Sequence, residues 1–283
     1  MSLVPHPKPL LRIRVHDLAL YPSLTAMCAG YEAGHWRCQH LAEHSMEWLP
    51  EFALKYSEFE NLGSANAVRL IKKAAKSIYK TKKFKRRGEF GELLLHIMIR
   101  HAFNTIPAIC KIHYKDSRND TVKGFDCVHV VASEDEGLEL WLGEVKFYKK
   151  ISAAIAEVVN ELEQHTGYDY LRDEFAAITN KIDGEWPYAE KLANLLDPNT
   201  SLDEVFDVVC IPVLLTYDSR VISNHDRIDG EFAKAFEKEV RKHHHTFSNK
   251  KLPDNFLIRL FLLPLESKEE LQKALNNELR KWH

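Results

Sequence analysis

The chain has 283 residues, of which 45% are hydrophobic and 28% charged, and its formal net charge is −2 at pH 7. This composition is too apolar for a disordered protein and too charged for a membrane protein. The near-neutral balance also excludes a chain that is basic as a whole, so any contact with nucleic acid must come from a local patch.

The N-terminal residues and the spacing of the cysteines indicate the cellular compartment. Five cysteines are widely spaced without a Cys-x-x-Cys pair, and Pro5, Pro7 and Pro9 stand where a signal peptide would need an apolar stretch. No apolar run of 18 residues occurs. We therefore expect a protein of the reducing cytoplasm with no membrane contact.

Residues 1–85 are expected to form a mostly helical N-terminal region. A short extended run is expected at residues 11–15, a helix at about 36–54, and a second helix at 64–79 with one apolar side. The opposite side of that second helix is basic, which opens a long positively charged stretch.

No acidic residue occurs between Asn61 and Gly88. We expect the positive side chains of this stretch to bind nucleic-acid phosphates, and the alternatives are a solvated face or a docking surface for an acidic partner. The residues are Arg69, Lys72, Lys73, Lys76, Lys80, Lys82, Lys83, Lys85, Arg86 and Arg87.

Residues 86–283 alternate between helical and strand-like patterns, which predicts an α/β domain. Pro212 falls inside an apolar strand and indicates an edge strand or a bulge. The expected helices are 89–103, 151–164, 167–180, 186–196, 229–243 and 268–282, and the expected strands are 108–114, 125–132, 138–147, 205–217 and 256–263.

Charged residues end the apolar strand at 138–147. Period-two alternation places Glu144 and Lys146 on the face that begins with three leucines. If residues 125–132 and 138–147 form a hairpin centred near Asp135, Asp126 and Glu144 lie opposite each other, with Cβ atoms about 4.5 to 5.5 Å apart. A surface pair would need no such placement.

Two carboxylates at that separation repel unless a cation lies between them, and Mg²⁺ or Mn²⁺ is the natural occupant of an oxygen site. Such a site would hydrolyse a phosphodiester, with Lys146 orienting the attacking water. Glu92, in the helix before the sheet, is expected to add a metal or water contact because Gly91 lets that helix approach the sheet closely.

Each of these motifs also has an interpretation that needs no nuclease activity. The Glu-x-Lys triplet also occurs at Glu266 to Lys268, and the first triplet could be an exposed strand-end pair. His35, Cys38, His40 and His44 could bind zinc, but no second cysteine or carboxylate completes the ligand spacing. Trp141 is expected in the core, not stacked on a base.

Gly124-Phe125-Asp126 followed by Gly143-Glu144-Val145-Lys146 resembles the PD-(D/E)XK restriction-endonuclease-like superfamily, with Phe125 where the superfamily often has proline. The segment from Arg87 to Leu95 before that pair resembles the HamA family, the nuclease subunits of the Hachiman anti-phage system. The resemblance implies a restriction-endonuclease-like mixed sheet with an α-β-β-β-α-β core, flanking helices and a helical N-terminal region.

The resemblance further implies a Mg²⁺-dependent nuclease that cuts DNA beside a superfamily 2 helicase of the HamB type in antiviral defence. No Walker A loop occurs in the sequence, so ATP-driven work would come from a partner. The alternatives are a non-catalytic nucleic-acid-binding or scaffold subunit of a helicase complex, and an RNase, because divalent-metal chemistry does not choose between the sugars.

Overall fold

A seven-stranded mixed sheet is the centre of the computed structural model, which describes residues 6–79, 88–110, 124–132 and 137–282. The strand order is β1-β2-β9-β8-β7-β6-β5, and β3 and β4 form a separate small ribbon. The strands are β1 Arg12–Asp17, β2 Ser23–Cys28, β3 Tyr31–Glu32, β4 His35–Trp36, β5 Ile106–Cys110, β6 Cys127–Ala132, β7 Leu138–Phe147, β8 Val209–Asp218 and β9 Leu257–Leu265.

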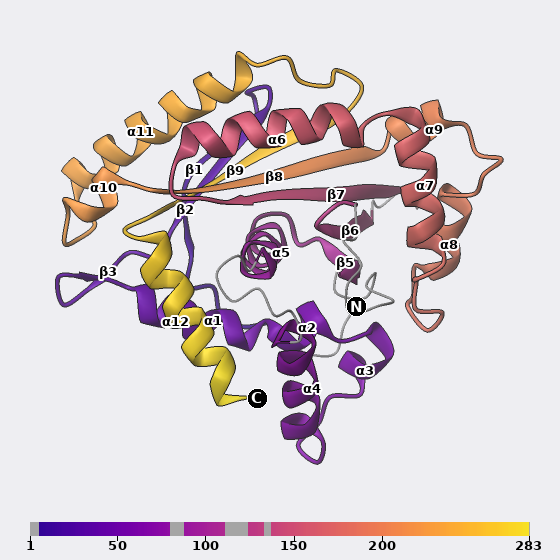
Figure 1. The fold of residues 1–283 in the computed structure, drawn as a ribbon, viewed down its shortest axis with the longest axis horizontal. Helices are drawn as coiled ribbons and strands as arrows, with labels where there is room; N and C mark the ends of the chain where they lie inside the picture. Colours follow the sequence, from indigo (N-terminus) through magenta and orange to yellow (C-terminus); the bar gives the residue numbers. More distant parts are fainter. Residues whose placement is uncertain (1–5, 80–87, 111–123, 133–136, 283) are drawn as a thin grey trace.

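Helices cover both faces of this sheet (Figure 1): α6 and α11 lie on one side, and α5, α1, α12 and α2 to α4 lie on the other. The helices are α1 Cys38–Glu47, α2 Leu49–Ala53, α3 Tyr56–Glu60, α4 Ala67–Tyr79, α5 Glu89–Phe103, α6 Ile151–His165, α7 Tyr168–Thr179, α8 Ala189–Leu195, α9 Leu202–Phe206, α10 Arg220–Ser223, α11 Gly230–Ser248 and α12 Lys268–Lys281.

The elements α5, β5, β6, β7, α6 and β8, with α7 to α9 inserted between α6 and β8, confirm the expected α-β-β-β-α-β core. Strands β6 and β7 pair antiparallel from Cys127 opposite Gly143 to Ala132 opposite Leu138, which is the register predicted for the hairpin. β7 then pairs parallel with β8, and β8 with β9. Parallel neighbours require crossover helices, and α6 is the first of them.

The prediction for Pro212 is wrong. β8 is a central strand between β7 and β9, and its register with β7 is the same on both sides of Pro212. Cys210 pairs with Trp141 and Val213 pairs with Glu144. A proline costs one ladder hydrogen bond, and the long flanking ladders hold the strand in place around that loss.

The N-terminal region contributes more strand than expected. β2 was not predicted because its residues show no alternation, and all six are buried, as in a strand covered on both faces. It pairs parallel with β9, so residues 12–28 extend the same sheet. The helix expected at 36–54 is two helices, because Pro50 stands in the first turn of α2 and cannot continue α1.

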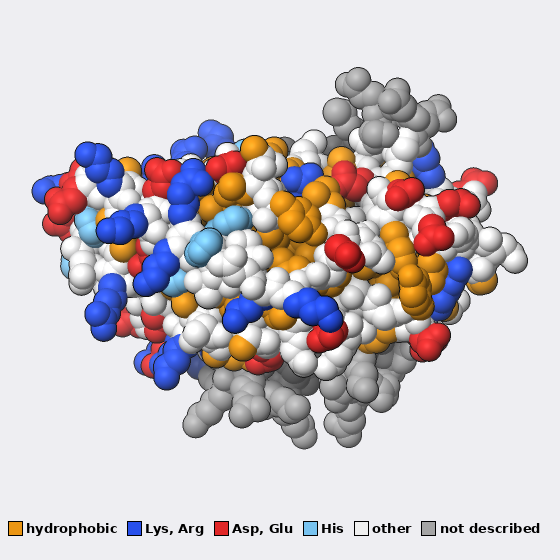
Figure 2. Space-filling view, turned by 90° about the horizontal axis from the view of Figure 1, so that it is seen from above, with side chains coloured by type: hydrophobic (Ala, Val, Ile, Leu, Met, Phe, Trp, Pro, Cys, Tyr) orange, Lys and Arg blue, Asp and Glu red, His pale blue; other side chains and the backbone are white. Residues whose placement is uncertain are grey.

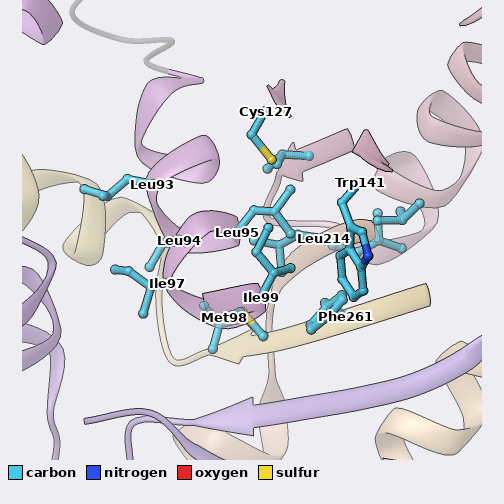
Figure 3. Packing of buried hydrophobic residues seen from close by; sticks show 14 of the residues in the cluster. Leu93, Leu94, Leu95, Ile97, Met98, Ile99, Cys127, Trp141, Leu214 and Phe261 are labelled. Carbon is cyan, nitrogen blue, oxygen red and sulfur yellow. The ribbon is translucent and has the colours of Figure 1, made fainter. Parts of the chain in front are cut away.

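α5 packs directly on the sheet because two glycines permit it. A Cβ on Gly91 would lie 2.6 Å from Val145 Cγ1, and one on Gly143 would lie 2.7 Å from Leu95 Cδ2. Figure 3 shows Leu95 and Ile99 of α5 on the side of the helix that faces Cys127 and Trp141, and Trp141 is buried as predicted. The face of β7 with Gly143 and Val145 therefore belongs to α5, which leaves the other face for α6.

The face of the molecule that α6 and α11 cover shows basic and acidic side chains intermixed around a more apolar middle (Figure 2). This mixture agrees with the net charge of −2. In the part of the chain that the structure describes, no helix is both long and apolar enough to cross a membrane.

Candidate active site

Glu144 and Lys146 project from the end of β7 toward α6. Glu144 is 1% exposed and Lys146 is 8% exposed. Alternation along the strand puts both side chains on the face opposite Gly143 and Val145, as the sequence predicted. The apolar packing between β7 and α6 thus ends in two buried charged groups of opposite sign.

Asp126 joins them from the residue before β6. Its backbone N–H donates to the Gly143 carbonyl at 2.7 Å, and its Oδ2 accepts a hydrogen bond from the Val145 N–H at 2.8 Å. The strand pairing itself ends at Cys127 opposite Gly143, and these two bonds tie Asp126 to the residues on either side of Glu144. The end of the hairpin therefore brings Asp126 to the strand end that carries Glu144 and Lys146, as the sequence pattern predicted.

The environment of Glu144 disfavours its charge. Burial raises the pKa of Glu144 to about 7, and the negative charges of Asp126 and Glu161 act in the same direction. The hydrogen bond with His165 opposes this effect by favouring the carboxylate. A carboxylate held in this state gains strongly from a nearby cation.

Lys146 is held by carboxylates of α6. It forms an ion pair with Glu161, and its Nζ lies 3.8 Å from Glu157 Oε1. The Tyr148 hydroxyl donates to Glu157 Oε2 at 2.5 Å. The lysine is thus fixed at the strand end, and a substrate phosphate would have to replace these carboxylates as its partner.

His165 is a member of this group that no sequence motif marked. Its Nδ1 lies 2.5 Å from Glu144 Oε1 at the end of α6. Its ring stacks on Tyr170 with centroids 4.5 Å apart and meets Phe125 edge-on at 5.6 Å. The signal that could have found it is spacing: Glu157, Glu161 and His165 recur every four residues and share one helix face.

The ring of Phe125, at the position where the resembled motif often has proline, supports the ring of His165. Gly124 precedes Phe125 with φ of +154°, and a Cβ there would lie 2.7 Å from Glu174 Oε2. The Phe125 N–H donates to Glu174 Oε1 at 3.3 Å. Glu174 therefore fixes the backbone that presents Asp126.

Glu92 is buried in the first turns of α5, on the helix that covers the opposite face of β7. The charges that shift the pKa of Glu144 are those of Asp126, His165 and Glu161, and Glu92 is not among them. The close approach that Gly91 was expected to permit is confirmed. The role of Glu92 at the site stays a prediction.

The donor set suits a hard divalent cation. Within the described ranges, no group of three or more His, Cys, Asp or Glu side chains is arranged to hold a metal ion. The candidate ligands are therefore the pair Asp126 and Glu144. A pair is compatible with Mg²⁺, which keeps several waters and binds proteins through one or two carboxylates plus substrate phosphates.

The basic stretch is only partly described. Arg69, Lys72, Lys73 and Lys76 are exposed along α4, whose other side is buried, and Lys73 forms an ion pair with Glu58. The remaining residues predicted to bind nucleic acid lie outside the described residues: Lys80, Lys82, Lys83, Lys85, Arg86 and Arg87. In Figure 1, α4 lies on the other side of the sheet from α6.

The histidines near α1 do not form a zinc site. His40 pairs with Glu32 at 3.0 Å, and His44 pairs with Glu47 at 2.8 Å while accepting from the Trp48 indole N–H. These are separate local contacts, and no three or more of the described His, Cys, Asp and Glu side chains gather here to hold a metal ion.

The sheet and its element order define a mixed α/β chain with the core arrangement of restriction-endonuclease-like proteins. The model of the HamA family matches residues 8–279, so the chain belongs to the HamA family. It is also similar to Anti-bacteriophage protein A of Escherichia coli (strain K12), with 23% identity over 267 residues. That match covers 88% of this chain but 46% of the relative, so the chain spans about half of the length of the curated relative.

Proposed function

We propose that this chain is a divalent-metal-dependent nuclease that cuts DNA in anti-phage defence. The observation that carries the proposal is the end of the β6–β7 hairpin, where Asp126 is hydrogen-bonded to Gly143 and Val145 on either side of Glu144, and Lys146 follows two residues further on the same strand face as Glu144. Membership of the HamA family and the name of the Escherichia coli relative support the defence role.

Asp126 and Glu144 would hold the cation, with Glu92 as a further contact. When bound, Mg²⁺ or Mn²⁺ supplies a Lewis acid for the phosphate and lowers the pKa of a coordinated water. Glu144 is prepared for this role, because a cation removes the repulsion from Asp126 that now raises its pKa. His165 holds Glu144 in one orientation through the contact of its Nδ1 with Glu144 Oε1.

Hydrolysis forms a bond from the water oxygen to phosphorus and breaks one phosphorus–oxygen ester bond. The water loses a proton, and the leaving alkoxide gains one. The Lys146 ammonium, released from Glu161, would donate hydrogen bonds to the attacking water or to a phosphate oxygen whose negative charge grows in the transition state.

The exposed basic face of α4 would then serve contacts away from the cleaved bond, either flanking phosphates or an acidic surface of a partner. A superfamily 2 helicase of the HamB type is the partner that we propose, because the resemblance to the HamA family implies one.

The test is cleavage of single-stranded DNA, duplex DNA and RNA with Mg²⁺, Mn²⁺ or EDTA, by the chain alone and with its helicase. We expect Glu144→Gln and Lys146→Met each to lower the cleavage rate by about 10²- to 10³-fold. Glu266→Gln, in the second Glu-x-Lys triplet, is the matched control and should cut normally. Activity that persists in EDTA or in both site variants would refute the proposal, and cutting of RNA alone would replace DNA as the substrate.

A further inference from the structure

The Lys146 ammonium is paired with two carboxylates of α6. It forms an ion pair with Glu161, and its Nζ lies 3.8 Å from Glu157 Oε1. In the part of the chain that the structure describes, these two glutamates are the residues with which it forms hydrogen bonds or ion pairs. The positive charge that a substrate phosphate would need is therefore already neutralised within the protein.

The two carboxylates lie on the solvent side of this lysine. The exposed fraction of the side chain rises from 9% for Lys146 to 27% for Glu161 and 47% for Glu157. A phosphate that arrives from solvent thus meets the glutamates before it meets the ammonium. Exposed side chains change rotamer on the picosecond to nanosecond scale. Both glutamates can therefore turn toward water while α6 itself stays in place.

Glu161 and Glu157 differ in how they are held. Glu161 is the direct partner of Lys146, and the contact of Glu157 is longer. The Tyr148 hydroxyl donates to Glu157 Oε2 at 2.5 Å, and the Tyr148 N–H donates to Thr216 Oγ1 at 3.0 Å. Glu157 is thus also fixed to the end of β7 and β8, so Glu161 is the partner whose release matters most for Lys146.

A carboxylate and a phosphate offer an ammonium the same kind of contact, a charged oxygen that accepts its hydrogen bonds. They cannot use the same N–H groups of Lys146 at once, so they compete. The exchange leaves Lys146 with an anionic partner and returns the partly exposed Glu161 to water, so neither charge is left buried and unpaired. The cost of opening is therefore small enough for a substrate to meet.

We propose that Glu161, supported by Glu157, is an internal competitor of the substrate: it holds Lys146 in the free protein and is displaced when a DNA phosphate binds. The proposal rests on the nuclease function proposed above and adds how its site is kept closed. The chain should consequently bind DNA more weakly than the charge of Lys146 by itself would allow.

The test is the affinity for fluorescein-labelled single-stranded and duplex DNA, measured by fluorescence anisotropy with Ca²⁺ in place of Mg²⁺. We expect Glu161→Gln to lower the Kd about 3- to 10-fold. Glu163→Gln is the matched control, because it removes the same charge from the same helix at a side chain that is 72% exposed and lies 3.9 Å from Lys251. This control should change the Kd by less than about twofold.

A double-mutant cycle shows whether Glu161 acts through Lys146. The charge of Glu161 also reaches Glu144, whose pKa it helps to raise, so part of the gain is direct. We expect most of the gain to be lost when Glu161→Gln is combined with Lys146→Met. Glu157→Gln should give a smaller gain and serves as the second variant if Glu161→Gln fails to fold.

Cleavage kinetics separate this proposal from the nuclease function. Glu161→Gln should lower KM while kcat changes little, whereas a residue that positions Lys146 for the reaction would lower kcat when replaced. An unchanged or raised Kd in Glu161→Gln, or an equal gain in the Lys146→Met background, would overturn the competition even if the wild type cuts DNA. A gain in binding without cleavage by any variant would instead refute the nuclease.

Discussion

Glu51 and Glu144 are buried carboxylates on opposite sides of the β6–β7 hairpin, and their surroundings shift their pKa values in opposite directions. Burial by itself would raise the pKa of Glu51, but the hydrogen bond from His96 and the charges of His96 and Arg100 lower it to about 2. Glu144 is equally buried, yet its neighbours include Asp126 and Glu161, and its pKa rises to about 7. One carboxylate is matched to cations that the fold provides, and the other is not.

The difference separates a structural role from a functional one. A buried ion pair whose members are all matched holds α2 to α5 and needs nothing more. A carboxylate kept at a raised pKa beside a second carboxylate costs stability, and such groups concentrate at functional sites. We therefore expect equivalent substitutions in the two groups to have effects of opposite sign on stability.

The largest expected effect is at Glu51. Glu51→Gln leaves Arg100 buried without its counter-charge and should lower the free energy of unfolding by about 3 to 5 kcal/mol. Because the folded-state pKa is depressed, the stability from Glu51 is present above pH 4.5 and is lost as the pH falls toward 2. Urea unfolding at pH 7 and at pH 3 measures both; equal losses at the two pH values would contradict this account.

His165→Phe sharpens the comparison at the other group. The phenyl ring keeps the stacking between Phe125 and Tyr170 but removes the contact with Glu144. We expect cleavage to fall about 10- to 100-fold, with a matching rise in the Mg²⁺ concentration needed for half-maximal rate. A lower rate at an unchanged Mg²⁺ requirement would show that His165 does not position the ligand.

The smallest effect is a gain. Because the folded-state pKa of Glu144 is raised, ionisation of Glu144 destabilises the folded protein as the pH rises from 4.5 through 7. Glu144→Gln removes that charge and should stabilise the metal-free protein by on the order of 2 kcal/mol at pH 8 and by little at pH 4. Thermal unfolding in EDTA at both pH values measures the gain, and destabilisation at pH 8 would break the contrast with Glu51.

Local pattern by itself determined α5 and the β6–β7 hairpin of the candidate site. The periods of α5 and β7, and the symmetric spacing of Asp126 and Glu144 about residue 135, depend on backbone geometry that neighbouring residues fix, so the hairpin register was predicted correctly. The Gly91 contact also followed from sequence, because only a residue without a side chain lets a helix pack so closely.

Only the tertiary structure decided the rest, because it depends on residues that meet from distant parts of the chain. β2 is a strand because β9, more than 200 residues later, pairs with it. His165 contacts Glu144 because α6 folds back over β7, and Glu51 meets His96 because α2 packs against α5. Pairings of this kind leave no periodic signal, since burial and charge at each residue are set by the partner that the fold supplies.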